Sequence, residues 1–134
     1  MRVELPLKMP VTAFVQVVGF NNKVREFQAI LDTGSTHSVI SLKEALDLGY
    51  DAYYPPDVGE VGTRVVMPRG ILECKMITLK EVRLGELKVL GLEAVAIGLP
   101  EQSGVIMLLG TNFLKSFKTT IDYGRGTLTI EEIK

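Results

Sequence analysis

The clearest candidate for chemistry in this chain is one aspartate at the end of an apolar run. The run ends at Leu31 and is followed by Asp32, Thr33, Gly34 and Ser35. A carboxylate can act as a general base when ionised and as a general acid when protonated. One carboxylate cannot do both at once, and the segment occurs once in 134 residues. The motif therefore predicts either a structural turn at a strand end or half of a site that a partner chain completes.

Composition excludes several other kinds of chemistry. The chain has 15 basic and 16 acidic residues, a formal net charge of -1 and no long block of one sign, which argues against nucleic acid and anionic membranes as partners. Cys74 is the only cysteine and His37 the only histidine. A disulfide scaffold, a zinc finger and a two-histidine metal site are therefore excluded. We expect no metal and no cofactor.

Length and hydropathy predict one domain over residues 1–134. Apolar residues make up 46% and charged residues 23% of the chain, as in a folded globular protein. The N-terminus has no apolar signal segment, and the longest apolar run, residues 105–109, is far shorter than the ~20 residues that span a bilayer. We therefore expect a cytoplasmic protein without membrane association.

Short strand patterns dominate the chain. The strand-like segments are residues 11–18, 24–31, 37–40, 60–67, 71–79, 82–84, 88–97, 105–109, 118–122 and 127–131. Ser41 and Glu44 have the spacing of a capping box, which predicts a short helix ending by Gly49. A second short helix is predicted over residues 111–117. Many short strands with two short helices predict a mostly β protein, and in particular a small closed β-barrel.

Two segments far apart in sequence could position the aspartate. The hairpin formed by residues 11–31 would deliver Asp32 to its far end. Much later, Leu108 and Leu109 end a buried strand, and Gly110 leads from that strand into the second helix.

This combination of an early Asp-Thr-Gly turn and a late Leu-Leu-Gly turn resembles retroviral-type (retropepsin-like) aspartic proteases, especially small cellular and microbial members. The resemblance covers about residues 11–131 and implies the acid-protease barrel. It also implies a homodimer, half a site in each chain, in which Asp32 of both subunits activates the water that hydrolyses an extended peptide. Two carboxylates would share one proton, one as base and one as acid. The other roles that it implies are an active-site turn of Thr33, Gly34 and Ser35, with Thr33 bonding across to the partner, and support of that turn by Leu31, Leu108, Leu109 and Gly110.

The resemblance also assigns a flap to a hairpin arm expected over residues 61–74. Its tip, which would contact substrate, comprises Met67, Pro68, Arg69 and Gly70; Arg69 could equally be a solvated turn residue. Proline fixes φ and stiffens the tip, which keeps open a catalytically silent peptide-binding or dimerisation module on the same fold. A small-molecule-binding barrel with an accidental motif would instead be a monomer.

No second aspartate in the chain fits the site. Asp122 is followed by Tyr123, where the family requires threonine or serine, and the segment is better interpreted as a hairpin turn. Asp47, Asp51 and Asp57 have no glycine turn after them. The enzyme interpretation therefore requires Asp32 from two chains about a twofold axis.

Four further side chains carry smaller expectations. A Ser35 hydroxyl beside the carboxylate would favour its ionised form and a more acidic activity optimum; the alternative is a local bond to the backbone. Asn112 stands where relatives carry aspartate, and we expect it to keep a capping role. His37 is expected to be structural or solvent-facing, and Cys74 to be a small buried hydrophobe.

Apolar residues alternate near both ends of the chain. Val3, Leu5 and Leu7 alternate near one end, and Leu128 and Ile130 near the other. Relatives interleave such strands between subunits, whereas a sheet within one chain is the alternative, and the sequence does not decide between them.

Overall fold

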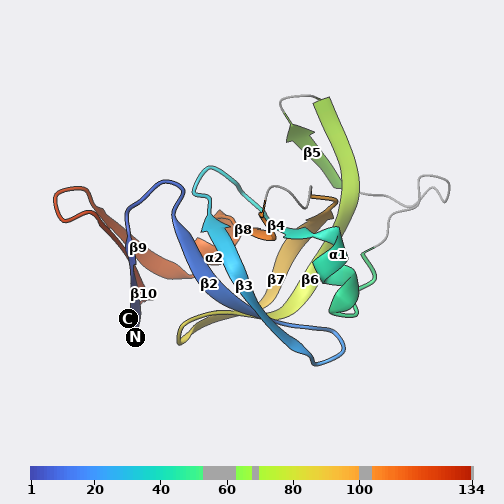
Figure 1. Ribbon diagram of the computed structural model, residues 1–134, viewed down its shortest axis with the longest axis horizontal. Coiled ribbons are helices and arrows are strands. Elements are labelled where there is room, and N and C mark those ends of the chain that lie inside the picture. The colour runs from blue at the N-terminus through green and yellow to red at the C-terminus, as the bar shows by residue number, and fades with distance from the viewer. Residues whose placement is uncertain (53–62, 68–69, 100–103, 134) are drawn as a thin grey trace.

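Alternating apolar residues give the chain strands that close around a shared core (Figure 1). The computed structural model describes residues 1–52, 63–67, 70–99 and 104–133. The elements are β1 (Arg2–Pro6), β2 (Thr12–Val18), β3 (Val24–Leu31), β4 (Ser38–Ser41), α1 (Leu42–Asp47), β5 (Thr63–Met67), β6 (Gly70–Leu84), β7 (Leu87–Ile97), β8 (Met107–Leu109), α2 (Thr111–Leu114), β9 (Phe117–Asp122) and β10 (Thr127–Glu132).

Six of these strands form the predicted closed barrel. They are hydrogen-bonded in the order β2-β3-β8-β4-β7-β6, and pairing between β2 and β6 closes the ring. The inward face of β3 carries Phe27, Ala29 and Leu31, all buried, as the alternation predicted. Burying one such large apolar side chain contributes about 1.5–3 kcal/mol relative to exposure. The mostly β fold with two short helices is therefore confirmed.

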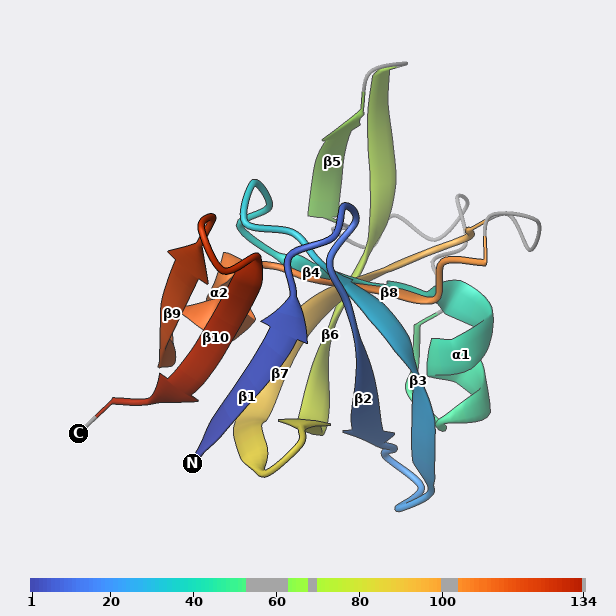
Figure 2. The ribbon, with the colours of Figure 1, turned by 60° about the vertical axis from the view of Figure 1, so that its left-hand side comes forward.

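The arm is an extension of the barrel strands. β5 pairs antiparallel with the first part of β6, from Thr63 opposite Cys74 to Met67 opposite Gly70, so a hairpin arm is present. In Figures 1 and 2 it rises from the same end of the barrel as the segment between β3 and β4.

The sequence predicted two separate strands, over residues 71–79 and 82–84. That division is wrong, because β6 continues without interruption through Lys80 and Glu81. Opposite Lys80, Gly91 adopts a φ of +67°, and the Lys80 N–H donates to the Tyr50 hydroxyl at 2.9 Å instead of to the neighbouring strand. Burial raises the pKa of Tyr50, and the Lys80 hydrogen bond opposes that effect. The interruption of strand pairing at Lys80 therefore lies where the sequence predicted the end of a strand.

The first helix forms where it was predicted, but not through a capping box. Ser41 occupies the N-cap position without a side-chain capping bond. Glu44 is buried and its carboxylate lies 2.8 Å from the Arg25 guanidinium on β3, so an ion pair replaces the expected return to the helix end. Within the described ranges, no helix has the length and hydropathy to cross a membrane.

The terminal strands form a sheet within one chain, the second of the two arrangements that the sequence left open. β1 pairs with β10, and β10 pairs with β9, all antiparallel. Val3 and Leu5 lie opposite Ile130 and Leu128, and these side chains pack against the main core. Both termini therefore lie beside this sheet (Figure 1). Its two outer strands, β1 and β9, carry the open edges.

Candidate active site

The site depends on a crossing of the chain. β8 lies between β3 and β4 and is parallel to β3, with Leu31 opposite Leu109. Because β3 and β4 are not neighbours, the loop of residues 32–37 that joins them must cross the end of β8 (Figure 2). Asp32 is the first residue of that loop.

Asp32 is fixed at both its backbone and its carboxylate. Its N–H donates to the Leu109 carbonyl at 2.8 Å, which extends the β3–β8 ladder by one residue. Its Oδ1 accepts the Gly34 N–H at 3.0 Å. The side chain is half-buried, so water and a reacting group can reach it. Ordinary Asx turns contain the same hydrogen bond. The turn at Asp32 differs from them because its loop crosses the end of β8.

Gly110 lies directly beneath the crossing loop. A Cβ atom placed on it would lie 2.4 Å from the His37 carbonyl oxygen and 2.8 Å from the Ser35 carbonyl oxygen. The next residue, Thr111, donates its N–H to that Ser35 oxygen at 2.7 Å. The loop therefore rests on the strand end through backbone contacts that only glycine allows.

A buried polar network, missed in the sequence, holds the crossing from below. The Ser38 hydroxyl is fully buried, donates to Asn112 Oδ1 at 2.8 Å and accepts the Gly110 N–H at 3.1 Å. Asn112 Nδ2 donates to the Glu93 carbonyl at 2.7 Å. The capping role expected for Asn112 is wrong, because Gly110 is the N-cap of α2 and no side chain caps it. A serine beside the apolar Val39 and Ile40 was the available signal, since buried hydroxyls need partners.

Ser38→Ala should destabilise the fold by about 2–3 kcal/mol, because it leaves the buried Gly110 N–H and Asn112 carbonyl oxygen without a partner. Urea unfolding measures the loss. Ser41→Ala is the matched control, because that half-exposed hydroxyl makes no capping bond, and it should cost under about 0.5 kcal/mol. Equal losses for the two variants would contradict the role given to Ser38.

The Ser35 hydroxyl bonds to the backbone and not to the carboxylate. It donates to the His37 carbonyl at 2.6 Å, and a hydroxyl has one proton to give. The local alternative for Ser35 is therefore the correct one, and the expected acid shift of the activity optimum loses its physical basis.

Ser35→Ala should lower stability by about 1 kcal/mol, the usual value of one hydrogen bond, and leave the pH profile of cleavage where it was. Chemical denaturation and initial rates between acidic and neutral pH check both parts. A pH profile of cleavage that shifts with this substitution would support the first expectation, that the Ser35 hydroxyl favours the ionised form of the carboxylate.

The apolar residues assigned to the turn divide between two clusters. Leu31 and Leu109 are buried in the main core. Leu108 is half-buried and packs with Val39, Cys74, Val95 and Ile97 in a smaller cluster near the base of the arm. Cys74 is buried, as expected, and burial raises the pKa of its thiol.

The remaining sequence candidates are placed as follows. Met67 and Gly70 face each other as the last pair of the arm, whereas Pro68 and Arg69 lie outside the described residues. His37 is exposed, with Nδ1 3.2 Å from the Thr36 hydroxyl.

Two of the other aspartates make contacts of their own away from Asp32. Asp122 Oδ1 accepts the Arg125 N–H at 3.0 Å and closes the β9–β10 hairpin. Asp51 pairs with Lys75 at 3.1 Å, and Asp57 lies outside the described residues. Across the part of the chain that the structure describes, no cluster of three or more His, Cys, Asp or Glu side chains is placed to hold a metal ion.

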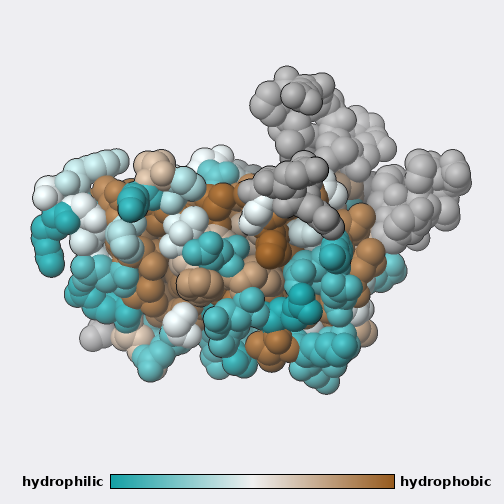
Figure 3. Space-filling model, in the orientation of Figure 1, coloured by the Kyte–Doolittle hydropathy of each residue, from teal (hydrophilic) through white to brown (hydrophobic). Residues whose placement is uncertain are grey.

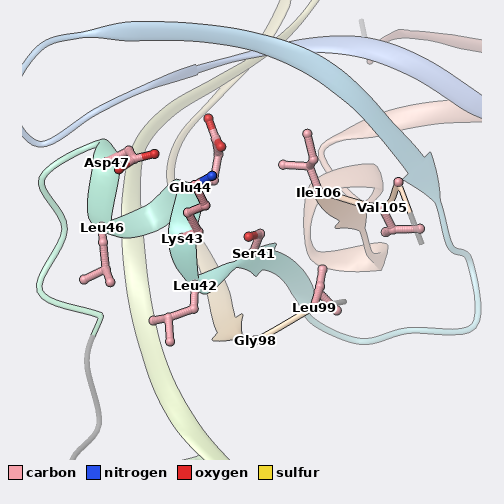
Figure 4. A pocket seen from close by; sticks show the side chains of 11 residues that line it. Ser41, Leu42, Lys43, Glu44, Leu46, Asp47, Gly98, Leu99, Val105 and Ile106 are labelled. Carbon is pink, nitrogen blue, oxygen red and sulfur yellow. The ribbon is translucent and has the colours of Figure 1, made fainter. Parts of the chain in front are cut away.

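Two hollows differ in their relation to Asp32. The larger, about 670 Å³, lies between α1 and the segment before β8, with Leu42, Leu46 and Ile106 on its walls (Figure 4). It includes no residue of the loop 32–37. The smaller, about 390 Å³, includes Leu31 and Thr33. The smaller hollow is therefore the one that adjoins the turn carrying the Asp32 carboxylate.

The crossing brings the Asp-Thr-Gly turn onto the end of the Leu-Leu-Gly strand, the two motifs on which the resemblance to aspartic proteases rests. The chain belongs to the family described as "gag-polyprotein putative aspartyl protease", whose model matches residues 17–116. No curated protein matches the chain.

Solved structures show the same fold. A retropepsin-like aspartic protease from Rickettsia conorii superposes with a TM-score of 0.70 at 19% identity, over 98% of this chain and 91% of that one. The retroviral protease-like domain of Ddi1 from Leishmania major gives a TM-score of 0.52 at 18% identity, with the same coverage of 98% and 91%. The retropepsin-like barrel is therefore established for this chain.

Proposed function

We propose that this protein is a homodimeric aspartic endopeptidase in which Asp32 of each chain contributes one carboxylate to a shared site. The observation that carries the proposal is the position of Asp32, half-exposed, with its carboxylate fixed by the Gly34 N–H on a loop that crosses β8. Family membership supports a hydrolase that cleaves peptide bonds.

The chemistry requires both carboxylates. One, ionised, takes a proton from a water held between them as the water oxygen attacks the peptide carbonyl carbon. The other, protonated, donates to the carbonyl oxygen as it gains negative charge. A proton then passes to the amide nitrogen, the C–N bond breaks, and the pair returns to one shared proton. Asp122 and Asp51 make contacts elsewhere in the chain, which supports a second carboxylate from a second chain.

The substrate is proposed to be an extended peptide bound between the arm and the loop 32–37. β5 is the last strand in its sheet order, so its outer edge can pair with an added strand. The apolar cluster at the base of the arm, which includes Val39 and Leu108, supports apolar side chains next to the cleaved bond.

Gly34→Ala should leave stability within about 0.5 kcal/mol of the parent and reduce cleavage by at least 10-fold. Among the described residues of one chain, a Cβ on Gly34 would meet only Asp32 Oδ1, at 3.4 Å, an ordinary contact. The proposal brings a partner turn and a substrate to this open position, where an added methyl group would collide with them. Thermal unfolding and peptide turnover on the same sample separate the two effects. Full activity in the variant would argue against a shared site at this turn.

A peptide-library cleavage assay at acidic and neutral pH tests the proposed activity. The unsubstituted protein should produce cleavage products that are absent with Asp32→Asn. Identical products from both proteins would identify a contaminating protease. No products from a dimeric protein at any pH would instead indicate the silent binding module.

A further inference from the structure

A third hollow, about 410 Å³, lies beside the far end of the loop 32–37 and shares no described residue with the two hollows above. Its walls come from that loop, from β7 and from the chain at and just after α2. The lining residues that carry the argument are Thr36, His37, Gly91, Glu93, Asn112 and Lys115. Because Thr36 and His37 end the loop that Asp32 begins, the hollow adjoins the proposed substrate site.

The walls of this hollow are polar and carry charges of both signs. Polar side chains alone are common on the surface, as Figure 3 shows for one face of the molecule. In the hollow, however, the exposed side chains of Glu93 and Lys115 come from separate segments, and neither forms an ion pair with a described residue. His37 Nδ1 lies 3.2 Å from the Thr36 hydroxyl, which leaves its Nε2 open to a ligand. The hollow therefore offers both hydrogen-bond donors and acceptors.

One edge of β7 opens into the same hollow. β6 pairs with β7 along one side, whereas on the other side β4 pairs only with residues 94–97. Residues 89–93 of β7 all line the hollow and have no described strand on that second side. The Asn112 amide approaches this edge and donates to the Glu93 carbonyl at 2.7 Å. An open strand edge presents backbone donors and acceptors that can pair with an extended peptide.

We infer that this hollow binds the main chain of substrate residues beyond those that flank the cleaved bond, so that long unfolded segments are the preferred substrates. The inference rests on the proposed function, because the peptide that enters the hollow is the continuation of the one held against the loop 32–37. Five positions separate Asp32 from His37, so their Cα atoms are at most about 18 Å apart. About five extended residues therefore suffice to reach the hollow from the cleaved bond.

A peptide main chain fits the charges of the hollow better than a ligand of one sign does. Glu93 would repel a purely anionic group, and Lys115 a purely cationic one. A peptide unit has an N–H that can donate to the Glu93 carboxylate and a C=O that can accept from the Lys115 ammonium group. These contacts do not involve the side chains of the substrate. The hollow should therefore select for length and for an unfolded chain rather than for sequence.

Peptides of two lengths test the inference. Both carry one cleaved core with three residues on each side of the bond, and the longer peptide adds five Gly-Ser residues at each end, which supply main chain with almost no side chain. The unsubstituted protein should cleave the longer peptide with a kcat/KM on the order of 10-fold higher, as expected for added charge-assisted hydrogen bonds. Lys115→Met combined with Glu93→Gln should remove most of that ratio. Glutamine keeps the backbone carbonyl that Asn112 contacts.

A matched pair of substitutions outside the hollow is the control. Lys23→Met combined with Glu86→Gln alters exposed side chains in the β2–β3 and β6–β7 connections and should keep the ratio of the unsubstituted protein. Circular dichroism verifies that both double variants fold. Binding without cleavage is measured by fluorescence anisotropy on Asp32→Asn forms of all three proteins, with labelled pools of random hexapeptides that carry or lack the same extensions.

The outcomes distinguish this site from the proposed activity. A ratio lost only in the hollow variant supports the inference. Extended pools that bind more tightly than short ones, except to the hollow variant, support it even if the unsubstituted protein cleaves nothing, which would count against the activity alone. Equal kcat/KM values for the two lengths, or a hollow variant that keeps the full ratio, overturn the inference and leave the activity standing.

Discussion

Asp32→Asn should reduce peptide cleavage on the order of 10⁴-fold, the loss usual when an essential catalytic group is removed, and leave the fold intact. An asparagine keeps the shape of the side chain and can still accept the Gly34 N–H that Asp32 accepts at 3.0 Å. It cannot take a proton from water or return one to the leaving nitrogen. We therefore expect an unfolding free energy within about 1 kcal/mol of the parent, measured with urea, beside initial rates on a cleaved peptide.

A mixture of the two proteins tests whether the site is shared. If two chains supply one carboxylate each, random pairing in an equal mixture leaves about one quarter of the dimers with both. Once subunits have exchanged, the activity of the mixture should be about one quarter of that of the unsubstituted protein alone at the same total protein concentration. A fall to one half would mean that each chain acts alone, and the twofold mechanism would be wrong.

Gly110→Ala should cost about 3 kcal/mol or more and abolish cleavage, because its methyl group has no room. The added Cβ would lie 2.4 Å from the His37 carbonyl oxygen and 2.7 Å from its carbon. These are backbone atoms of the crossing loop, so they cannot yield as a flexible side chain would. Either the loop lifts from β8 and displaces Asp32, or the strand end moves. Urea unfolding and peptide turnover should both report the change.

Gly98→Ala is the matched control for that substitution. Gly98 is exposed after β7, and a Cβ placed there meets no described residue within 4 Å. We expect its unfolding free energy to stay within about 0.5 kcal/mol of the parent. Similar stabilities for the two alanine variants would show that the loop 32–37 does not rest on the end of β8.

Many of the elements were predictable because each has a local signal, whereas the crossing over β8 was not. Alternation identified β2 and β3, and the Leu-Leu-Gly sequence identified the strand end beneath the turn. The resemblance to retropepsin-like proteases then placed these parts in one barrel, which the structure confirms.

What could not be predicted depended on partners distant in sequence. Glu44 has the spacing of a capping residue, but the Arg25 guanidinium on β3 lies within 2.8 Å and binds it instead. In the sequence the Ser35 hydroxyl is adjacent to the carboxylate turn, but in the structure it donates to the His37 carbonyl at 2.6 Å. Ser38 had no evident function because its partners, Gly110 and Asn112, lie more than 70 residues away. Local patterns assign elements, whereas tertiary contacts decide which polar atoms meet.

The placement of β8 between β3 and β4 also bears on when the loop that carries Asp32 can take its final position during folding. The bond from Gly110 to Ser38 joins residues 72 positions apart, so the loop 32–37 gains its support only after Gly110 has been synthesised. Contacts of such long sequence separation form late and slow folding. A growing chain that ends before Gly110 would carry Asp32 on an unsupported loop. The order of synthesis therefore delays the support of Asp32 until β8 has formed.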